Sequence, residues 1–189
     1  MPIEIVRVEP VHKGWTTFSI ATIRMEDGRT VTREVEDHGR AACVLAYDPD
    51  RRVALLVRQF RAPAFLAAKK PDLLEAIAGI VDETDSREAA RREALEEAGV
   101  ALHELEHVGE VWTTPGISTE RMDLFLAPYR SHDRTGPGGG VASEYESIAV
   151  VEMKLGTLAE MADKGELSDL KTFALLQTLR LRRPDLFAA

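Results

Sequence analysis

The segment Ser86–Ala98 (SREAARREALEEA) constrains the fold most, because it has the clearest helix pattern in the chain. Asp85 stands before it as an N-cap with Glu88 three residues on, and the two form the pattern of a capping box. Gly99 supplies the stop signal at the other end. A helix with both ends set in this way also sets the face on which each of its side chains lies.

The two faces of this helix differ in chemistry. Ala90 and Ala94 form one stripe, and Glu93 and Glu97 form the stripe beside it, because residues four apart share a face. Small residues let the helix press against a sheet, so these carboxylates, with Glu96 near them, fall at the edge of the buried face. Like charges at this spacing repel, so the arrangement is mildly unfavourable by itself. A divalent cation bound between the carboxylates would make it favourable. The alternative is a solvated acidic face balanced by neighbouring arginines.

Segments with strand composition surround this helix. Before residue 61 we expect two hairpins, at 16–25 with 30–35 and at 41–47 with 53–60, the first turning at Asp27-Gly28. We expect further strands at 105–113, 120–127 and 148–154, helices at 157–164 and 170–182, and a loop at 131–140. Residues 72–78 fit a strand or the start of a helix. Many strands with few helices predict an α+β protein, in which helices cover the faces of a mixed sheet.

Composition limits the class of protein. The chain is 44% apolar and 30% charged, as in ordinary globular proteins. No apolar run approaches the ~20 residues of a membrane span, and the N-terminus lacks a signal-peptide pattern. Cys43 is the only cysteine and lies in an apolar run, so we expect a buried structural thiol. Together these features favour a cytoplasmic protein with no membrane partner.

The net charge of −8 disfavours nucleic acid as a partner, because nucleic-acid binding needs a basic surface. It does not exclude a small anionic substrate. Carboxylates that hold divalent cations can make a protein acidic and still place it on phosphate groups.

The residues around the helix resemble a known motif. Gly79 precedes the helix, and residues 92–100 (REALEEAGV) close it. This run resembles the second half of the Nudix box, R-E-apolar-any-E-E-any-G-apolar. The first half departs from the box by one residue, because its Glu position falls on Thr84 or Asp85. The resemblance implies a Nudix α/β/α sandwich around a mixed sheet, and an Mg²⁺-dependent pyrophosphohydrolase in which Mn²⁺ can substitute.

Other segments indicate a branch of this family. Residues 58–61 (RQFR) and Pro115, 15 residues after Val100, are similar to the ADP-ribose and nucleotide-sugar branch. Closer still is the GDP-mannose hydrolase subgroup. The similarity there covers 33–39 (REVEDHG), the shortened loop after Gly79, the glycines 138–140 and 169–172 (DLKT). The order of these segments along most of the chain carries this assignment.

The resemblance and the helix pattern together give the expected metal ligands. Glu93 and Glu97 are the principal ligands and Glu96 is a further ligand or bridge, because Mg²⁺ prefers hard oxygen donors. The resemblance adds the backbone carbonyl of Ala78. It also implies that an acidic loop contributes a late metal ligand, best matched by Glu146, and a general base, for which Glu144 is the weaker candidate. The candidate catalytic residues are Glu96, Glu97, Glu144 and Glu146.

The expected substrate contacts are fewer and less specific. Arg61 offers a planar fork to phosphate oxygens. Arg58, Arg33 and Lys171 are weaker candidates, and Pro115 belongs to the loop that relatives place beside the substrate. For Phe60 and Trp112, core packing is favoured over stacking on a base.

The resemblance also implies an assembly. Residues 1–40 are expected to form N-terminal strands that cross to the partner subunit of a homodimer, and 41–189 the Nudix hydrolase domain. The alternative is an extra antiparallel sheet within one monomer. The expected substrate is a nucleotide sugar, GDP-mannose before ADP-ribose. A non-catalytic Nudix ligand sensor is the alternative from another class, and the intact glutamates disfavour it.

Overall fold

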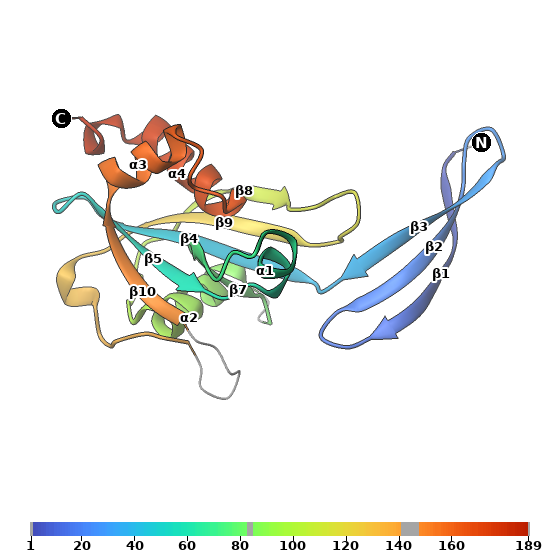
Figure 1. The fold of residues 1–189 in the computed structure, drawn as a ribbon, viewed down its shortest axis with the longest axis horizontal. Helices are drawn as coiled ribbons and strands as arrows, with labels where there is room; N and C mark the ends of the chain where they lie inside the picture. The colour runs from blue at the N-terminus through green and yellow to red at the C-terminus, as the bar shows by residue number, and fades with distance from the viewer. Residues whose placement is uncertain (1, 83–84, 141–147, 189) are drawn as a thin grey trace. The chain divides into compact units, whose positions relative to one another are not determined.

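The computed structural model describes residues 2–82, 85–140 and 148–188 (Figure 1). The chain forms two compact units. The first consists of Met1–Ala41 with Glu110–Met122, and the second of Ala42–Gly109 with Asp123–Ala189. In the described part of the chain, no helix is long and apolar enough to cross a membrane.

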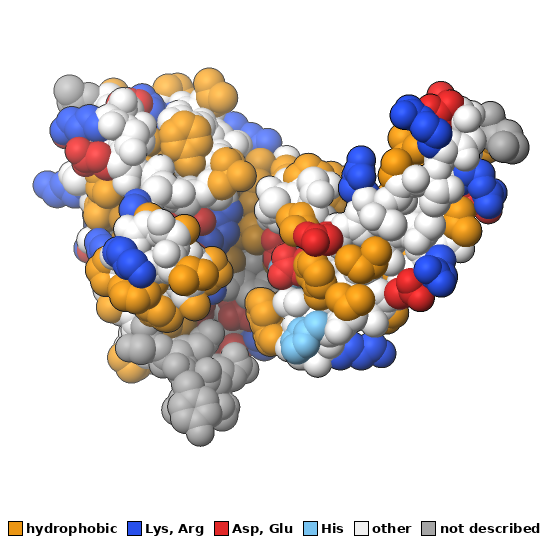
Figure 2. All heavy atoms as spheres, turned by 45° about the vertical axis from the view of Figure 1, so that its right-hand side comes forward, with side chains coloured by type: hydrophobic (Ala, Val, Ile, Leu, Met, Phe, Trp, Pro, Cys, Tyr) orange, Lys and Arg blue, Asp and Glu red, His pale blue; other side chains and the backbone are white. Residues whose placement is uncertain are grey.

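The first unit is built on a three-stranded antiparallel sheet of β1 (Glu4–Lys13), β2 (Thr17–Arg24) and β3 (Thr30–Asp37). The hairpin between β2 and β3 confirms the sequence prediction. Its strands pair from Thr17 opposite Asp37 to Arg24 opposite Thr30, and Gly28 in the turn has a φ of +83°, which favours glycine. All ten residues of β1 are exposed, and hydrophobic side chains are visible on this sheet (Figure 2).

The second unit contains a seven-stranded sheet. Its path runs β10 (Ile148–Lys154), β5 (Val53–Gln59), β4 (Arg40–Asp48), β9 (Arg121–Pro128) and β8 (Glu106–Trp112). The short strands β6 (Leu73–Glu75) and β7 (Ile77–Ile80) pair with β5 and β4. The ambiguous segment 72–78 is therefore strand, because its apolar residues lie inside the sheet.

Helices lie on both faces of this sheet, α2 (Ser86–Ala98) on one and α3 (Leu155–Asp163) and α4 (Leu170–Arg182) on the other (Figure 1). These elements confirm the predicted α+β sandwich. A short helix, α1 (Ala62–Ala68), was not predicted from the sequence. It follows Arg61, has a proline in its first turn and buries none of its residues.

The core beneath α2 is built on alanine. Ala89, Ala90, Ala94 and Ala98 are fully buried and pack with strand residues that include Val44, Leu55, Val57 and Phe125. Side chains this small bring the helix backbone close to the sheet. On β4, Cys43 is also fully buried, and burial raises the pKa of its thiol far above the ordinary value. Both results confirm the sequence predictions.

Candidate active site

Helix α2 is fixed at both ends by the residues that the sequence indicated. The side chain of Asp85 accepts a hydrogen bond from the backbone N–H of Arg87 at 2.9 Å, so it is the N-cap. Gly99 ends the helix with a φ of +62°, and its N–H donates to the carbonyl of Leu95 at 3.0 Å. The acidic face of the helix is thereby held in one register against the sheet.

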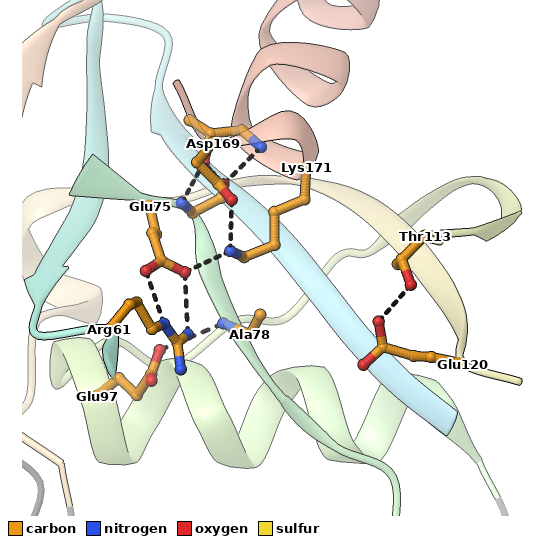
Figure 3. A network of polar contacts seen from close by, with 10 residues as sticks. Arg61, Glu75, Ala78, Glu97, Thr113, Glu120, Asp169 and Lys171 are labelled. Atoms are coloured by element: carbon orange, nitrogen blue, oxygen red, sulfur yellow. Dashed lines mark hydrogen bonds and ion pairs between the residues drawn. The ribbon is translucent and has the colours of Figure 1, made fainter. Parts of the chain in front are cut away.

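Glu97 lies inside this interface. It is 2% exposed, and its carboxylate accepts a hydrogen bond from the backbone N–H of Ala78 at 3.2 Å. A buried carboxylate needs such donors, because taking it out of water without partners is costly. The structure thus brings together two of the predicted metal ligands, Glu97 from α2 and Ala78 from β7 (Figure 3).

Glu93 approaches the same strand at Gly79. A Cβ atom on Gly79 would lie 1.9 Å from Oε1 of Glu93 and 2.1 Å from its Cδ. A Cβ at this position would displace the Glu93 side chain, so glycine allows the close approach of this carboxylate to the strand. The glycine that the sequence matched to the start of the Nudix box therefore makes room for a carboxylate of its second half.

Arg92 links the remaining carboxylates to the sheet. Its guanidinium donates to Glu93 at 2.8 Å and to Glu96 at 3.1 Å, and also to the carbonyl of Ile80 at 3.0 Å. These bonds reduce the repulsion between neighbouring carboxylates on α2. Across residues 2–82, 85–140 and 148–188, no three His, Cys, Asp or Glu side chains gather as a metal-ligand group.

The glycine-rich loop docks on the C-terminal end of α2. The N–H of Gly139 donates to the carbonyl of Glu97 at 2.8 Å, and that of Gly140 to the carbonyl of Glu96 at 3.1 Å. Gly138 has a φ of +69°, and a Cβ there would lie 2.4 Å from the carbonyl oxygen of Glu97. The loop thus satisfies carbonyls that a helix end leaves without partners.

The predicted acidic residues Glu144 and Glu146 follow this loop. They lie outside the described residues, which stop at 140 and resume at 148. Their assignment as general base and late metal ligand therefore stays a prediction.

A buried network of charges lies beside Glu97. Arg61 donates from Nε and Nη2 to the two oxygens of Glu75 at 2.8 and 2.9 Å, and Lys171 donates to Glu75 and, at 2.8 Å, to Asp169. Glu75 is 1% exposed. Figure 3 shows the four side chains converging, with Glu97 near Arg61.

The charges in this network stabilise one another. Burial would raise the pKa of Glu75, but hydrogen bonds from Arg61 and the charge of Lys171 outweigh it, so this pKa lies below its ordinary value. Burial would lower the pKa of Lys171, but the charges of Asp169 and Glu75 outweigh it and raise this pKa. The hydrogen bond to Glu75 raises the pKa of Arg61, and the charge of Glu97 adds to that effect. Glu75 is therefore ionised, and Lys171 and Arg61 are protonated, at neutral pH.

Comparison with known proteins shows the family. A model of the NUDIX domain matches residues 37–180, a span that contains α2, Gly79 and the buried network. The chain belongs to the Nudix family.

Two relatives of this Nudix hydrolase share a name. The GDP-mannose pyrophosphatase of Cronobacter sakazakii is 40% identical over 161 residues, which cover 83% of each chain. That of Pectobacterium atrosepticum is 34% identical over 186 residues, which cover 96% of this chain and 95% of the relative. A solved ADP compounds hydrolase superposes with a TM-score of 0.78 over 98% of this chain and 96% of its own. Its identity of 17% supports the fold alone.

The predicted substrate contacts of this Nudix hydrolase have different surroundings. Arg58 is exposed and bonds to Asp72 at 2.8 Å, whereas the next residue on the strand, Gln59, is buried. Arg61 is partly exposed and bound to Glu75. The Lys171 side chain is only 14% exposed and has both its carboxylate partners beside it.

Arg33 and Pro115 belong to the first unit. Arg33 lines a groove of about 390 Å³ with Gly116 and Ile117, the two residues after Pro115. The loop that contains Pro115 and residues 116–119 is hydrogen-bonded to the end of β3. The carbonyl of Glu36 accepts from the N–H of Thr119 at 2.9 Å, and the N–H of Glu36 donates to the carbonyl of Ile117 at 2.8 Å. Arg33 and the two residues after Pro115 thus line the same groove.

The same loop is braced by side chains. Glu120 accepts from Thr113 at 2.6 Å (Figure 3) and lies 2.9 Å from Nε2 of His38. Asp37 accepts from Thr119 at 2.6 Å. This bonding and the bond to the backbone N–H of Gly39 hold the pKa of Asp37 below its ordinary value.

The expected core packing of two aromatic residues was wrong. Phe60 is 57% exposed and Trp112 is 56% exposed. Phe60 stands just past the end of β5 and packs on Phe65 of α1, at 5.7 Å between ring centroids. Trp112 ends β8, where the guanidinium of Arg121 lies 5.9 Å from its ring centroid. Phe60 follows the end of β5 and Trp112 is the last residue of β8.

Glu75, Asp169 and Arg92 are members of the site that were not predicted from the sequence. Glu75 is the one charged residue within the otherwise apolar run 73–78 (LLEAIA), and an isolated charge there indicates a buried partner. Its partners are Arg61, 14 residues away just after β5, and Lys171, 96 residues away in α4. The signal therefore indicates that a partner exists but does not identify it.

Proposed function

We propose that this Nudix hydrolase cleaves the pyrophosphate bond of a nucleoside diphosphate sugar, with GDP-mannose yielding GMP and mannose 1-phosphate. The observation that carries the proposal is the burial of Glu97 against Ala78, with Glu93 and Glu96 on the same helix. The names of the relatives, at 34–40% identity over most of the chain, support the choice of substrate.

The donors in this region fit a divalent cation. They are carboxylate oxygens and one backbone carbonyl, the ligand type that Mg²⁺ prefers, and the missing Cβ of Gly79 lets the Glu93 carboxylate lie against the strand that carries Ala78. Glu93, Glu96, Glu97 and the carbonyl of Ala78 would hold Mg²⁺ or Mn²⁺, with Glu146 as a further ligand. A bound cation of this kind neutralises phosphate charge and lowers the pKa of water.

Side chains of the protein would bind the substrate and remove the proton of the attacking water. We assign Arg61 to a phosphate of the substrate, because Glu75 takes Nε and Nη2 and Nη1 belongs to the same planar fork. Glu144 or Glu146 would remove a proton from the attacking water. The resemblance alone supports Arg33 and Pro115 as further substrate contacts.

We also propose the assembly and setting that the sequence suggests. Strands 1–40 would cross to the partner in a homodimer, with 41–189 as the hydrolase domain. The apolar residues exposed on β1 support this, since Ile5, Val8 and Val11 are 52–64% exposed and a second copy would cover them. The substrate would be a small cytoplasmic molecule, with neither nucleic acid nor a membrane as partner. Size-exclusion chromatography with light scattering measures the molar mass in solution and tests the dimer. The mass of a monomer would contradict it.

The substrate is tested by product analysis with Mg²⁺, with GDP-mannose and ADP-ribose supplied separately at equal concentration. Faster release of GMP and mannose 1-phosphate is expected. Faster release of AMP and ribose 5-phosphate would keep the chemistry and reassign the substrate to the alternative that Pro115 and the 58–61 segment favour. No cleavage of either would refute the proposal and favour a non-catalytic ligand sensor.

A further inference from the structure

The strand segment that carries Ala78 changes its pairing partner at Ala76. β6 pairs with β5 before this residue, and β7 pairs with β4 after it. Ala76 belongs to neither strand and is only 1% exposed. A buried backbone N–H needs a hydrogen-bond acceptor, because leaving it without one is costly. The junction therefore depends on an acceptor from another part of the fold.

Thr172 of α4 supplies this acceptor. Its hydroxyl oxygen accepts from the N–H of Ala76 at 2.6 Å, and the hydroxyl donates to the carboxylate of Asp169, the N-cap residue of α4. A backbone N–H can only donate, so the hydroxyl accepts there and directs its single proton to Asp169. Thr172 is fully buried, and branching at its Cβ restricts the rotamer. The position of the acceptor is therefore set by the start of α4.

A second helix holds the same strand segment two residues later. The N–H of Ala78 donates to the carboxylate of Glu97 on α2 at 3.2 Å. Helices α2 and α4 lie on opposite faces of the sheet (Figure 1), and Figure 3 shows Asp169 and Glu97 on the two sides of this strand. The backbone between β6 and the middle of β7 is thus fixed by one side chain from each helix.

We propose that Thr172 is a positioning residue, which holds the backbone at Ala76 and so sets where Ala78 meets Glu97. The inference rests on the proposed function for the role of Ala78 and Glu97 as metal ligands. Without the hydroxyl, the N–H of Ala76 would be buried without a partner, and the strand would shift to relieve that cost. Such a shift moves the carbonyl of Ala78, two residues away, relative to the carboxylates of α2.

Mn²⁺ binding in the absence of substrate tests this inference, with free Mn²⁺ measured by electron paramagnetic resonance. Thr172→Val keeps the shape of the side chain and removes the hydroxyl. We expect it to raise the dissociation constant of Mn²⁺ by about 10- to 100-fold, the usual effect of losing a group that supports a metal ligand. Thr172→Ser restores the hydroxyl and should bring the dissociation constant back close to that of the wild type.

The matched control is Thr178→Val on the same helix. The hydroxyl of Thr178 donates to the carbonyl of Ala174 within α4 at 2.9 Å, so its removal breaks no bond to the strand and should leave Mn²⁺ binding unchanged. A lower melting temperature of Thr172→Val with an unchanged Mn²⁺ dissociation constant would overturn the inference, because the hydroxyl would then only stabilise the fold. If Thr172→Val does not fold, as judged by circular dichroism, Thr172→Cys takes its place, because sulfur is a weak acceptor. It should also weaken Mn²⁺ binding, and unchanged binding would overturn the inference.

Backbone amide exchange, followed by NMR on the metal-free protein, gives a measurement that depends on neither metal nor turnover. In Thr172→Val, the amides of Ala76 and Ala78 should both exchange at least about tenfold faster than in the wild type, because the hydrogen bond that holds this segment is lost. Faster exchange at Ala76 alone would overturn the inference, since the change would not reach Ala78. If the wild type binds no Mn²⁺, the proposed metal site fails, while the exchange of Ala78 still decides whether Thr172 positions this strand.

Discussion

Gly79→Ala separates the role of Glu93 in the fold from its role in the site. The added Cβ would lie 1.9 Å from Oε1 of Glu93, so this side chain must move. The atoms in the way belong to the end of a flexible side chain, so the fold can absorb the change. We expect a loss of about 1–2 kcal/mol in the free energy of unfolding, from a displaced rotamer and a partly exposed ion pair with Arg92.

Activity should suffer much more than stability. Displacing a metal ligand or its support typically costs about 10- to 100-fold in metal affinity or activity. The assay is hydrolysis of GDP-mannose over a range of Mg²⁺ concentrations, with thermal melting in parallel. We expect the half-saturating Mg²⁺ concentration to rise and the maximal rate to fall.

Gly109→Ala is the matched control, because Gly109 also lies in a strand and a Cβ there meets no atom within 4 Å. It should leave both the rate and the Mg²⁺ dependence unchanged. Wild-type activity and wild-type Mg²⁺ dependence in Gly79→Ala would refute the position assigned to Glu93.

Three further changes test other parts of the site. Gly138→Ala should lower the free energy of unfolding by about 1–2 kcal/mol or more, measured by urea denaturation, because the left-handed backbone is unfavourable for alanine and its Cβ would meet Glu97. Arg61→Ala should raise KM for GDP-mannose by about tenfold or more, whereas Lys164→Ala, which removes an exposed pair with Glu160, should leave KM unchanged. Glu75→Gln should flatten the acid side of the stability profile. The folded pKa of Glu75 is lowered, so its contribution is present above the ordinary value of 4.5 and is lost as pH falls through the folded pKa; an unchanged profile of melting temperature against pH would contradict it.

Local patterns predicted the elements that depend on local chemistry. Asp85 and Gly99 indicated where the helix Ser86–Ala98 begins and ends, and the structure has the same bounds. Helix α1 was missed because its sequence (APAFLAA) has no polar face from which a period could be read. None of the residues of α1 is buried, so no alternation of buried and exposed positions marks the helix.

Long-range pairing was beyond the sequence. The 110–122 segment belongs with the N-terminal strands through contacts such as the bridge between Glu36 and Ser118, and neither residue has a neighbour in sequence that signals the other. The network of Glu75, Lys171 and Arg61 is similar. Each residue was visible as a charge, but their meeting depends on how β5, β6 and α4 are arranged in space.

Glu97→Gln tests the central claim most directly, because glutamine keeps an acceptor for the N–H of Ala78 and removes only the charge. The measurement is Mg²⁺-dependent release of GMP from GDP-mannose, with the melting temperatures of the wild type and variant compared. We predict that turnover falls by at least about 100-fold, in line with loss of a metal-supporting group, while the fold stays intact. A folded Glu97→Gln enzyme with full activity would contradict the assignment of this helix as the metal-binding and catalytic element.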